Sequence, residues 1–539
     1  VTLDDDHEPV PVTLDLTVAG GTPLGGRCLL PFTWRGEVRL IETAYLGDTP
    51  GALAFRVTDS HLQPGGDGLR SNAPAQLWDW LKQLIHPRIE AFTVDLSPLL
   101  TGAADLLEAA LRSRPDSAAQ VLPTLALHDP IGRETGLEIN LGFVLPELAP
   151  AERAAPPTAP LGAAELARWE AHWQAYDAFV TWAIKHFAHD YPGPLRQEFM
   201  TALTTARYRL RDALDTEHPG PDPVRDLFHH TWANLTPLIA RAAANSSSGR
   251  ALRFLAFVNA GDALSALDAV GQQYGIRIDQ YGLRELARAL EPDVAAVELA
   301  YSLAPDPELR VLYGFSAEFP QAPATAERAW YDWFVATAEA AAIDPTLSAE
   351  LDGWVPRRDD LDRFLTRMDA LFEAVIAAET AGGKVASPFL PVYRTLIRAT
   401  AWQESCWRQF VERGGEVQAI RSPAGSVGLM QINRHVWRGV YDPATLEADV
   451  AYNARAGSEI LVHYLVDYAV RGKEHEREGG IDNLARATYA VYNGGPGHLQ
   501  RYRDPDSRPG LQALDQAFWK KYLAIRSMGS DAVRQCYGE

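Results

Sequence analysis

The sequence is short of cysteine, of basic side chains and of long apolar runs, and each shortage excludes a class of protein. Its 539 residues include only 3 cysteines, Cys28, Cys406 and Cys536. Three cysteines are too few for a disulfide-rich scaffold, and no two of them have the close spacing of a zinc site. No stretch approaches the roughly 18–20 uninterrupted apolar residues of a membrane-spanning helix. We therefore expect no membrane span, and the sequence implies no metal and no organic cofactor.

Basic side chains are outnumbered by acidic ones. Lys and Arg total 50 against 70 Asp and Glu, which gives a formal net charge of −20 at pH 7. The deficit lies entirely in residues 1–384, because residues 385–539 carry 19 basic and 17 acidic side chains. An acidic bulk of this size disfavours nucleic acid and anionic lipid as partners, since phosphate contacts need clustered Lys and Arg.

The length and composition predict a multidomain globular chain. At roughly 100–200 residues per domain, this length corresponds to two to four domains. Hydrophobic residues make up 47% and charged residues 22%, which excludes a mainly disordered or fibrous protein. We expect a mainly α-helical protein with an N-terminal α+β domain, a central helical region and a C-terminal α domain.

The N-terminal region, 1–147, alternates apolar and polar residues in four short runs, which is typical of half-buried antiparallel strands. The runs are Val12 to Val18, Leu53 to Val57, Phe92 to Leu96 and Leu137 to Phe143. Leu77, Leu81 and Leu84 have helical spacing, and Asp105 to Leu111 forms a second candidate helix. We expect an α+β accessory domain of unknown role.

A linker and a helical region follow. Residues 148–162 are rich in Pro and Ala and show no periodic pattern, which is typical of a linker. In 163–384, apolar side chains recur every three or four residues, from Leu166 to Phe187 and from Leu361 to Val375. This pattern predicts a helical domain, and its aromatic residues are expected to be core.

Residues 385–539 contain the candidate chemistry, starting with Glu404. This carboxyl group lies in a helical, mostly apolar segment next to Trp402, Cys406 and Trp407. Such surroundings destabilise the anion and raise the pKa of the carboxyl group. A raised pKa is what a general acid needs at neutral pH. A lone Glu in a helix is more often exposed or paired with an Arg, such as Arg408 four residues later.

Three further motifs follow Glu404-Ser405 in the chain. They are Ser-x-x-Gly-x-x-Gly-Leu-Met-Gln from Ser422 to Gln431, Asn-x-x-x-Gly from Asn453, and Tyr-Asn-x-Gly from Tyr492. The set, in this order, resembles the soluble lytic transglycosylases, whose catalytic domain is similar to goose-type lysozyme. The resemblance covers about 390–505 and implies a lysozyme-like α domain over 385–539.

The resemblance assigns roles to individual residues. Glu404 would be the catalytic acid and base, and Tyr492 would donate a hydrogen bond to its carboxyl group. The glycines at 425 and 428 permit a tight turn, so that Met430 and Gln431 would line a groove for a sugar ring. Ser422 and Asn493 are further expected substrate-binding residues, whereas Asn453 and Gly457 would only support the fold.

The resemblance also implies a reaction on peptidoglycan glycan strands. Glu404 would protonate the oxygen between N-acetylmuramic acid and N-acetylglucosamine and then act as base on the C6 hydroxyl. That hydroxyl attacks C1 and leaves a 1,6-anhydro end. Its intramolecular attack has a high effective concentration. A periplasmic or cell-envelope location in a bacterium follows from this substrate.

Two alternatives stay open. The separation of Glu404 and Ser422, 18 residues, is longer than is common in the family, and the extra segment contains Glu412 and Glu416. The pair Gly414–Gly415 predicts a turn of a hairpin. If Glu416 points inward, it could activate water, and the protein would be a hydrolytic muramidase. The other alternative is an envelope scaffold that binds glycan without cleaving it.

Two further expectations concern the envelope. Cys406 and Cys536 could form a disulfide in an oxidising compartment, whereas three buried free thiols would account for the cysteines equally well. The acidic residues 1–384 could keep the protein away from anionic wall polymers, or could dock a basic envelope protein.

Overall fold

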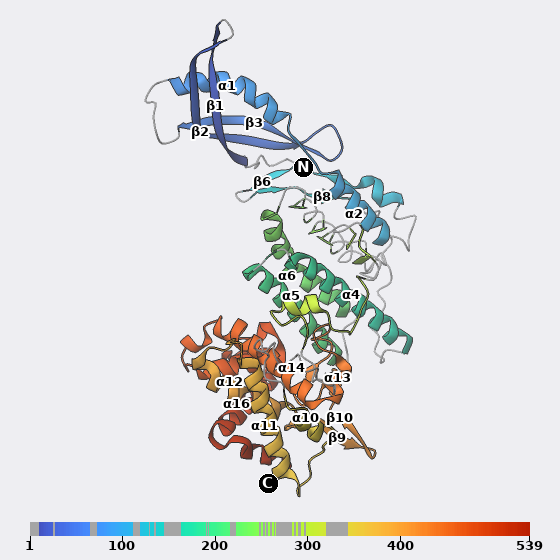
Figure 1. Ribbon diagram of the computed structural model, residues 1–539. Helices are drawn as coiled ribbons and strands as arrows, with labels where there is room; N and C mark the ends of the chain where they lie inside the picture. The colour runs from blue at the N-terminus through green and yellow to red at the C-terminus, as the bar shows by residue number, and fades with distance from the viewer. Residues whose placement is uncertain are drawn as a thin grey trace, which may run out of the picture. The chain divides into compact units, whose positions relative to one another are not determined.

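The chain is mainly helical, with a sheet region near the N-terminus (Figure 1). The computed structural model describes residues 10–144 and 163–246 with short gaps, scattered positions from 250 to 295, and residues 298–319 and 343–538. It divides into two compact units, one of 1–155 with 239–294 and one of 156–238 with 295–539. The predicted linker, 148–162, lies outside the described residues, and the predicted domain boundaries stay a prediction.

The first unit contains a four-stranded antiparallel sheet in the order β1-β2-β3-β4. Its strands are β1 (Val10–Leu24), β2 (Arg27–Leu46), β3 (Ala52–Pro64) and β4 (Thr93–Asp95). Three of them confirm predicted strands, whereas β2 was missed. The apolar alternation of β2 is interrupted because its buried face includes Glu42, whose pKa is raised by burial.

Helices and short strands occupy the described part of residues 73–142 in this unit. Ala44, Leu53, Leu96 and Leu99 form a small apolar core between the sheet and α2. The elements are α1 (Ala73–Glu90), α2 (Ser97–Ala110), η1 (Leu122–Thr124), β5 (Ala126–Leu127), β6 (Ile131–Arg133), β7 (Gly136–Glu138) and β8 (Leu141–Gly142).

The second unit begins with long helices, in agreement with the helical periodicity of this part of the sequence. Most of the apolar stripe of α4 is buried, and α4 packs on α5. Where the caps are described, aspartate side chains accept hydrogen bonds from the first turns of α9 and α10. The helices are α4 (Ala163–His189), α5 (Pro194–Asp215), α6 (Pro223–Ala244), α9 (Pro307–Leu312), α10 (Pro345–Leu351) and α11 (Leu361–Thr380).

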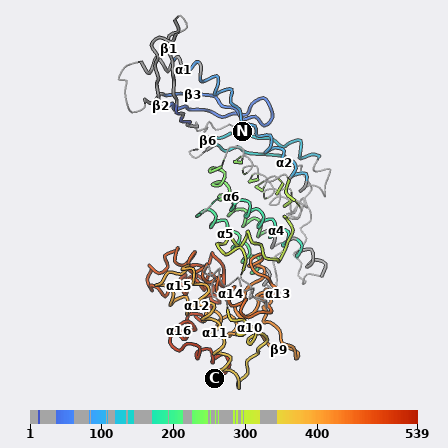
Figure 2. Tube along the Cα trace, viewed as in Figure 1, coloured from blue at the N-terminus to red at the C-terminus, as the bar shows by residue number. Residues whose placement is uncertain are grey.

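The rest of this unit is a helical array around α12, which packs against α11, α14, α15 and α16, as the tube in Figure 2 also traces. Its helices are η3 (Ser387–Phe389), α12 (Leu390–Ser405), α13 (Pro443–Ala448), α14 (Val450–His463), the π-helix η4 (Tyr464–Val470), η5 (Glu474–Glu476), α15 (Asp482–Gly494), η6 (Pro496–His498), η7 (Arg501–Arg503), α16 (Pro509–Met528) and η8 (Gly529–Tyr537). Its strands are β9 (Phe410–Arg413), β10 (Glu416–Ala419), β11 (Ser426–Val427) and β12 (Ile432–Asn433).

A buried ion network ties the early helices to the C-terminal array. Asp177 of α4 accepts a hydrogen bond from Arg207 Nε of α5 at 3.0 Å and pairs with Arg438. Thr181 accepts hydrogen bonds from both guanidinium groups. Removing one partner of a buried ion pair leaves an uncompensated charge, so such a network holds these helices in one arrangement.

None of the helices in the described part of the chain combines the length and the apolar character needed to cross a bilayer.

Candidate active site

Glu404 lies in the last turn of α12, where the helix packs into the C-terminal array. The residue is partly buried, between Trp402, which is 3% exposed, and Ser405, which is 6% exposed. Burial raises the pKa of the Glu404 carboxyl group to about 7, although Tyr489, Arg211 and Lys521 each act to lower it. A carboxyl group with this pKa is substantially protonated at neutral pH and can donate a proton.

The hydrogen bond to Glu404 comes from Tyr489, which corrects the prediction for Tyr492. Tyr489 Oη donates to Glu404 Oε1 at 3.1 Å, whereas Tyr492 Oη donates to the carbonyl oxygen of Met430 at 2.6 Å. The pKa of Tyr489 is raised well above 10 by burial, so this hydroxyl keeps its proton and serves as a donor. Its ring stacks on Phe518 of α16 with centroids 3.9 Å apart, which fixes its direction.

The glycine-rich loop after the hairpin is held by short-range hydrogen bonds. Ser422 Oγ accepts from the backbone N–H of Ser426 at 3.0 Å. Gly428 has a φ of +74°, and an added Cβ would collide with the side chains of Gln409 and Asn453. Gln431 also has a positive φ, 46°, and its amide donates to the Gly428 carbonyl at 2.8 Å. Ser422 and Gln431 are thus placed in the turn that the motif predicts.

Met430 lies in the core rather than in a groove wall. Its side chain is 0% exposed and contacts Gly457, where there is no room for a Cβ. Its N–H donates to Asn453 Oδ1 at 2.9 Å, and the Asn453 amide donates to the carbonyls of Val427 and Leu446, both at 3.0 Å. The predicted groove position of Met430 is therefore corrected, because helix α14 covers its side chain. Asn453 and Gly457 support the fold, as expected.

The residue after α12 is fixed by a disulfide. Cys406 caps the helix in the left-handed region, with φ of 56°, and is joined to Cys536 in η8, 130 residues later. The Tyr537 hydroxyl donates to the Cys406 carbonyl at 2.8 Å. The structure therefore selects the disulfide from the two alternatives for these cysteines. It anchors the end of the helix that carries Glu404.

The extra segment after Glu404 is a β-hairpin, as predicted. Strands β9 and β10 pair antiparallel, and Gly414 and Gly415 have φ values of 62° and 83°, which suit a two-residue turn. The hairpin projects from the body of this unit (Figure 1). Glu416 is exposed at its tip, and Glu412 pairs with Arg357 at 3.7 Å. Neither Glu412 nor Glu416 forms a described contact with Glu404.

Helix α5 contacts the Tyr-Asn-x-Gly motif from a distant part of the sequence. Tyr208 Oη donates to the carbonyl of Tyr492 at 2.7 Å, and Arg211 Nη1 donates to the carbonyl of Asn493 at 2.6 Å. The side chain of Asn493 accepts a hydrogen bond from Arg501 at 3.1 Å. The predicted residues Tyr492 and Asn493 therefore meet α5, which no sequence motif indicated.

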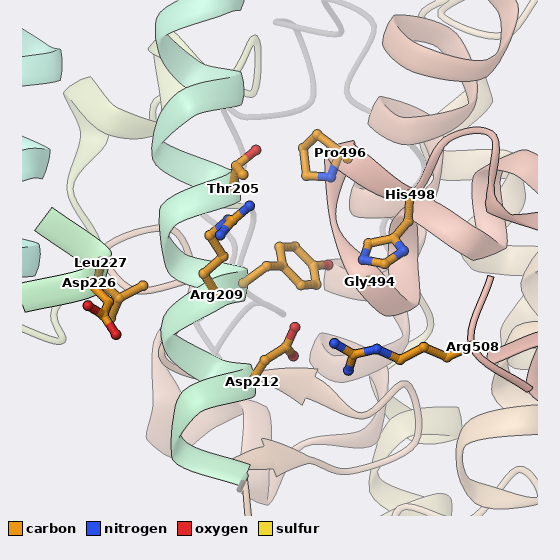
Figure 3. A pocket seen from close by; sticks show the side chains of 11 residues that line it. Thr205, Arg209, Asp212, Asp226, Leu227, Gly494, Pro496, His498 and Arg508 are labelled. Carbon is orange, nitrogen blue, oxygen red and sulfur yellow. The ribbon is translucent and has the colours of Figure 1, made fainter. Parts of the chain in front are cut away.

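A cleft of about 500 Å³ lies beside this contact (Figure 3). Asp212 of α5 and Arg508, which directly precedes α16, point toward one another across it. Burial lowers the pKa of His498, so this ring is neutral at pH 7. Hydroxyl, carboxylate, guanidinium and imidazole groups suit a polar ligand with many hydroxyls. The lining residues are Thr205, Tyr208, Arg209, Asp212, Asp226, Leu227, Gly494, Pro496, Gly497, His498 and Arg508.

A comparison with known families matches this region. The family model described as the transglycosylase SLT domain matches residues 391–512. This part of the chain is therefore similar to a transglycosylase SLT domain. The match confirms the resemblance drawn from the motifs and implies a glycan-cleaving, transglycosylase-type enzyme that acts on peptidoglycan. No curated protein and no solved structure matches the chain.

The SLT domain contains Glu404, its partner Tyr489 and the four predicted motifs, but not the whole site. Tyr208 and Arg211 on α5, and Lys521 on α16, lie outside residues 391–512. The spacing of the aromatic residues in 163–215 predicts only that they are core, so no sequence signal separates Tyr208 from its neighbours. Within the part of the chain that the structure describes, no group of three or more His, Cys, Asp or Glu side chains could hold a metal ion.

Proposed function

We propose that the protein is a peptidoglycan lytic transglycosylase with Glu404 as general acid and base. The observation that carries the proposal is the Glu404 carboxyl group itself. It lies inside a matched SLT domain, has a pKa near 7 and accepts a hydrogen bond from Tyr489. This combination supports proton transfer to a leaving oxygen at neutral pH.

The proposed reaction needs one protein carboxyl group. Protonated Glu404 gives its proton to the oxygen between N-acetylmuramic acid and N-acetylglucosamine as the C1–O bond breaks. The substrate's N-acetyl group stabilises the positive charge at C1. The Glu404 carboxylate then takes the proton of the C6 hydroxyl, whose oxygen bonds to C1. The products are a 1,6-anhydro end and a free N-acetylglucosamine hydroxyl.

Among the described residues, no carboxylate is one of the groups that shift the pKa of Glu404, which favours this route over hydrolysis. Inverting and retaining hydrolases place two carboxyl groups about 5–9.5 Å apart, on either side of the bond. Glu416, the candidate second carboxylate, is exposed at the hairpin tip. When the C6 hydroxyl of the substrate attacks C1, no water has to be positioned, so the reaction needs no second carboxylate for that purpose.

The test is mass spectrometry of the fragments released from purified peptidoglycan. Anhydro ends are lighter than reducing ends by one water, about 18 Da. We expect anhydro ends from the wild type and a loss of about 10²–10⁴-fold in rate for Glu404→Gln. The control Glu416→Gln should release anhydro ends at the wild-type rate. Reducing ends that disappear in Glu416→Gln would establish the muramidase, and sacculus binding without any fragments would establish the scaffold.

We also propose a location in the bacterial periplasm or cell envelope. The proposed substrate lies outside the cytoplasmic membrane, and the Cys406–Cys536 disulfide suits an oxidising compartment. Cell fractionation with peptide mapping under non-reducing conditions tests this location. A cytoplasmic protein with both thiols free would overturn it.

A further inference from the structure

Helix α5 reaches the C-terminal end of α15, the helix that carries Tyr489. The last four carbonyl groups of an α-helix have no partner within the helix. Two of those in α15 accept hydrogen bonds from α5, namely Tyr492 from Tyr208 and Asn493 from Arg211. A cation at a helix C-terminus also interacts favourably with the helix dipole. Helix α5 therefore caps α15 from a different part of the chain.

The capping side chains are themselves held in place. Arg211 also donates to Asp212 through Nε at 2.9 Å, and its guanidinium lies 4.7 Å from the centre of the Tyr208 ring. The Tyr208 hydroxyl accepts a hydrogen bond from Tyr464 at 3.3 Å. The Tyr208 ring packs against Gly495, where an added Cβ would lie 2.7 Å from the ring. These contacts leave Tyr208 and Arg211 little freedom to move away from α15.

The same residues are close enough to Glu404 to act on its charge. Among the described residues, Arg211 and Lys521 of α16 are the cations that lower the pKa of Glu404. The charge of Glu404 in turn raises the pKa of neighbouring hydroxyl groups, namely those of Tyr489 and Tyr492 of α15 and of Tyr208 of α5. The positive charges of Arg211 and Lys521 stabilise the carboxylate that remains after the proton of Glu404 has been given to the leaving oxygen.

We propose that Tyr208 and Arg211 of α5 are positioning residues for Glu404. They hold the end of α15 so that Tyr489 orients the Glu404 carboxyl group, and Arg211 adds positive charge beside it. The inference rests on the proposed function and deepens it, because it assigns part of the active site to a helix about 180 residues before the SLT domain.

The experiment measures kcat, KM and the pH dependence of kcat/KM on soluble peptidoglycan strands, using the full chain. Activity requires protonated Glu404, so kcat/KM falls as the pH rises through the pKa of this group. Arg211→Gln removes a charge that lowers this pKa. We expect kcat to fall about tenfold. We also expect the pH range in which kcat/KM falls, called the falling limb of the pH profile, to move to higher pH by about half a unit or more. Arg211→Lys keeps the charge and should return the limb to its wild-type position.

Two more variants separate positioning from folding. Tyr208→Phe keeps the ring that lines the cleft but loses the hydroxyl, so kcat should fall about three- to tenfold with KM unchanged. Arg196→Gln removes the same charge from the same helix, 15 residues and therefore about 22 Å away from Arg211, and should leave the pH profile unchanged. Thermal melting shows whether each variant is folded at the assay temperature.

The outcomes are distinct. An inactive wild type would overturn the proposed function. An active wild type with an Arg211→Gln variant of unchanged kcat and unchanged pH limb would overturn only the inference. A fall in kcat that follows a lower melting temperature, with the pH limb unmoved, would show a structural role and would also overturn it.

Discussion

At the residue scale, the site depends on one carboxyl group whose charge is costly to bury. The pKa of Glu404 is raised from 4.5 to about 7, mainly by desolvation. The folded protein therefore keeps a proton on Glu404 at pH values where the unfolded chain has lost it. Between about pH 4.5 and pH 7 this residue stabilises the fold less and less as the pH rises. At neutral pH the burial of Glu404, the proposed acid, therefore lowers the free energy of unfolding.

Glu404→Gln should accordingly be more stable than the wild type at high pH. We expect a gain in the free energy of unfolding of about 1–3 kcal/mol at pH 8 and no gain near pH 4, where the carboxyl group is protonated in both states. Urea unfolding at the two pH values measures the difference. The matched control is Glu416→Gln, in which an exposed carboxylate is replaced. An equal gain at both pH values would mean that Glu404 does not titrate as described.

A comparison of two tyrosines tests the corrected hydrogen bond. Tyr489→Phe removes the donor to Glu404, so activity should fall about tenfold or more and the falling limb of the pH profile should move to higher pH. Tyr492→Phe removes a donor to the Met430 carbonyl and should cost about 1 kcal/mol of stability without moving the limb. If only Tyr492→Phe moved the limb, the assignment from the family motif would be the right one.

At the element scale, the sequence predicted those strands, helices and turns that depend on short-range patterns. The alternation of β1 and the stripes of α4 and α11 depend on neighbours within a few residues, and so does the turn at Gly414–Gly415. The strand β2 was missed because a glutamate occupies its buried face. The groove role of Met430 was wrong because burial by α14 depends on residues about 25 positions away.

The glycine-rich loop gives a prediction at this scale. Gly428→Ala places a Cβ at positive φ against Gln409 and Asn453, which both hold the loop. We expect a loss of about 2–5 kcal/mol in the free energy of unfolding, from backbone strain and overpacking together. The control is Gly414→Ala in the hairpin turn, which has a positive φ but open space around it. It should cost only about 1–2 kcal/mol. Equal losses in denaturant titrations would show that steric contact at Gly428 is unimportant.

At the scale of the whole molecule, the disulfide connects the end of α12, the helix of Glu404, to the end of the described chain. It closes a loop with a sequence separation of 130 residues that includes most of the SLT match, and Cys406 follows Glu404 by two positions. Cross-links that close long loops restrict the unfolded chain most in the loop-entropy model. The bond therefore stabilises the domain as a unit and holds the C-terminus of α12 in place.

Cys536→Ser should lower the stability of the domain by about 2–5 kcal/mol. Dithiothreitol should lower the melting temperature of the wild type to that of the variant and should leave the variant unchanged. The measurement is thermal unfolding with and without the reductant. A wild type that is insensitive to the reductant, with both thiols alkylated in the folded state, would contradict the disulfide.

The sequence by itself determined the family resemblance and the local geometry of this protein. The acid at Glu404 and the motif order predicted the SLT domain, because a motif is a set of residues at fixed short spacing. The tertiary structure alone decided which groups meet. Tyr489 and Tyr492 lie three residues apart on one face of α15, about 4.5 Å along the axis, and only packing selects the one that reaches Glu404. The same holds for Arg211 and for Cys536, which come from distant segments. Such contacts depend on how helices pack against one another, and no spacing in the sequence encodes that directly.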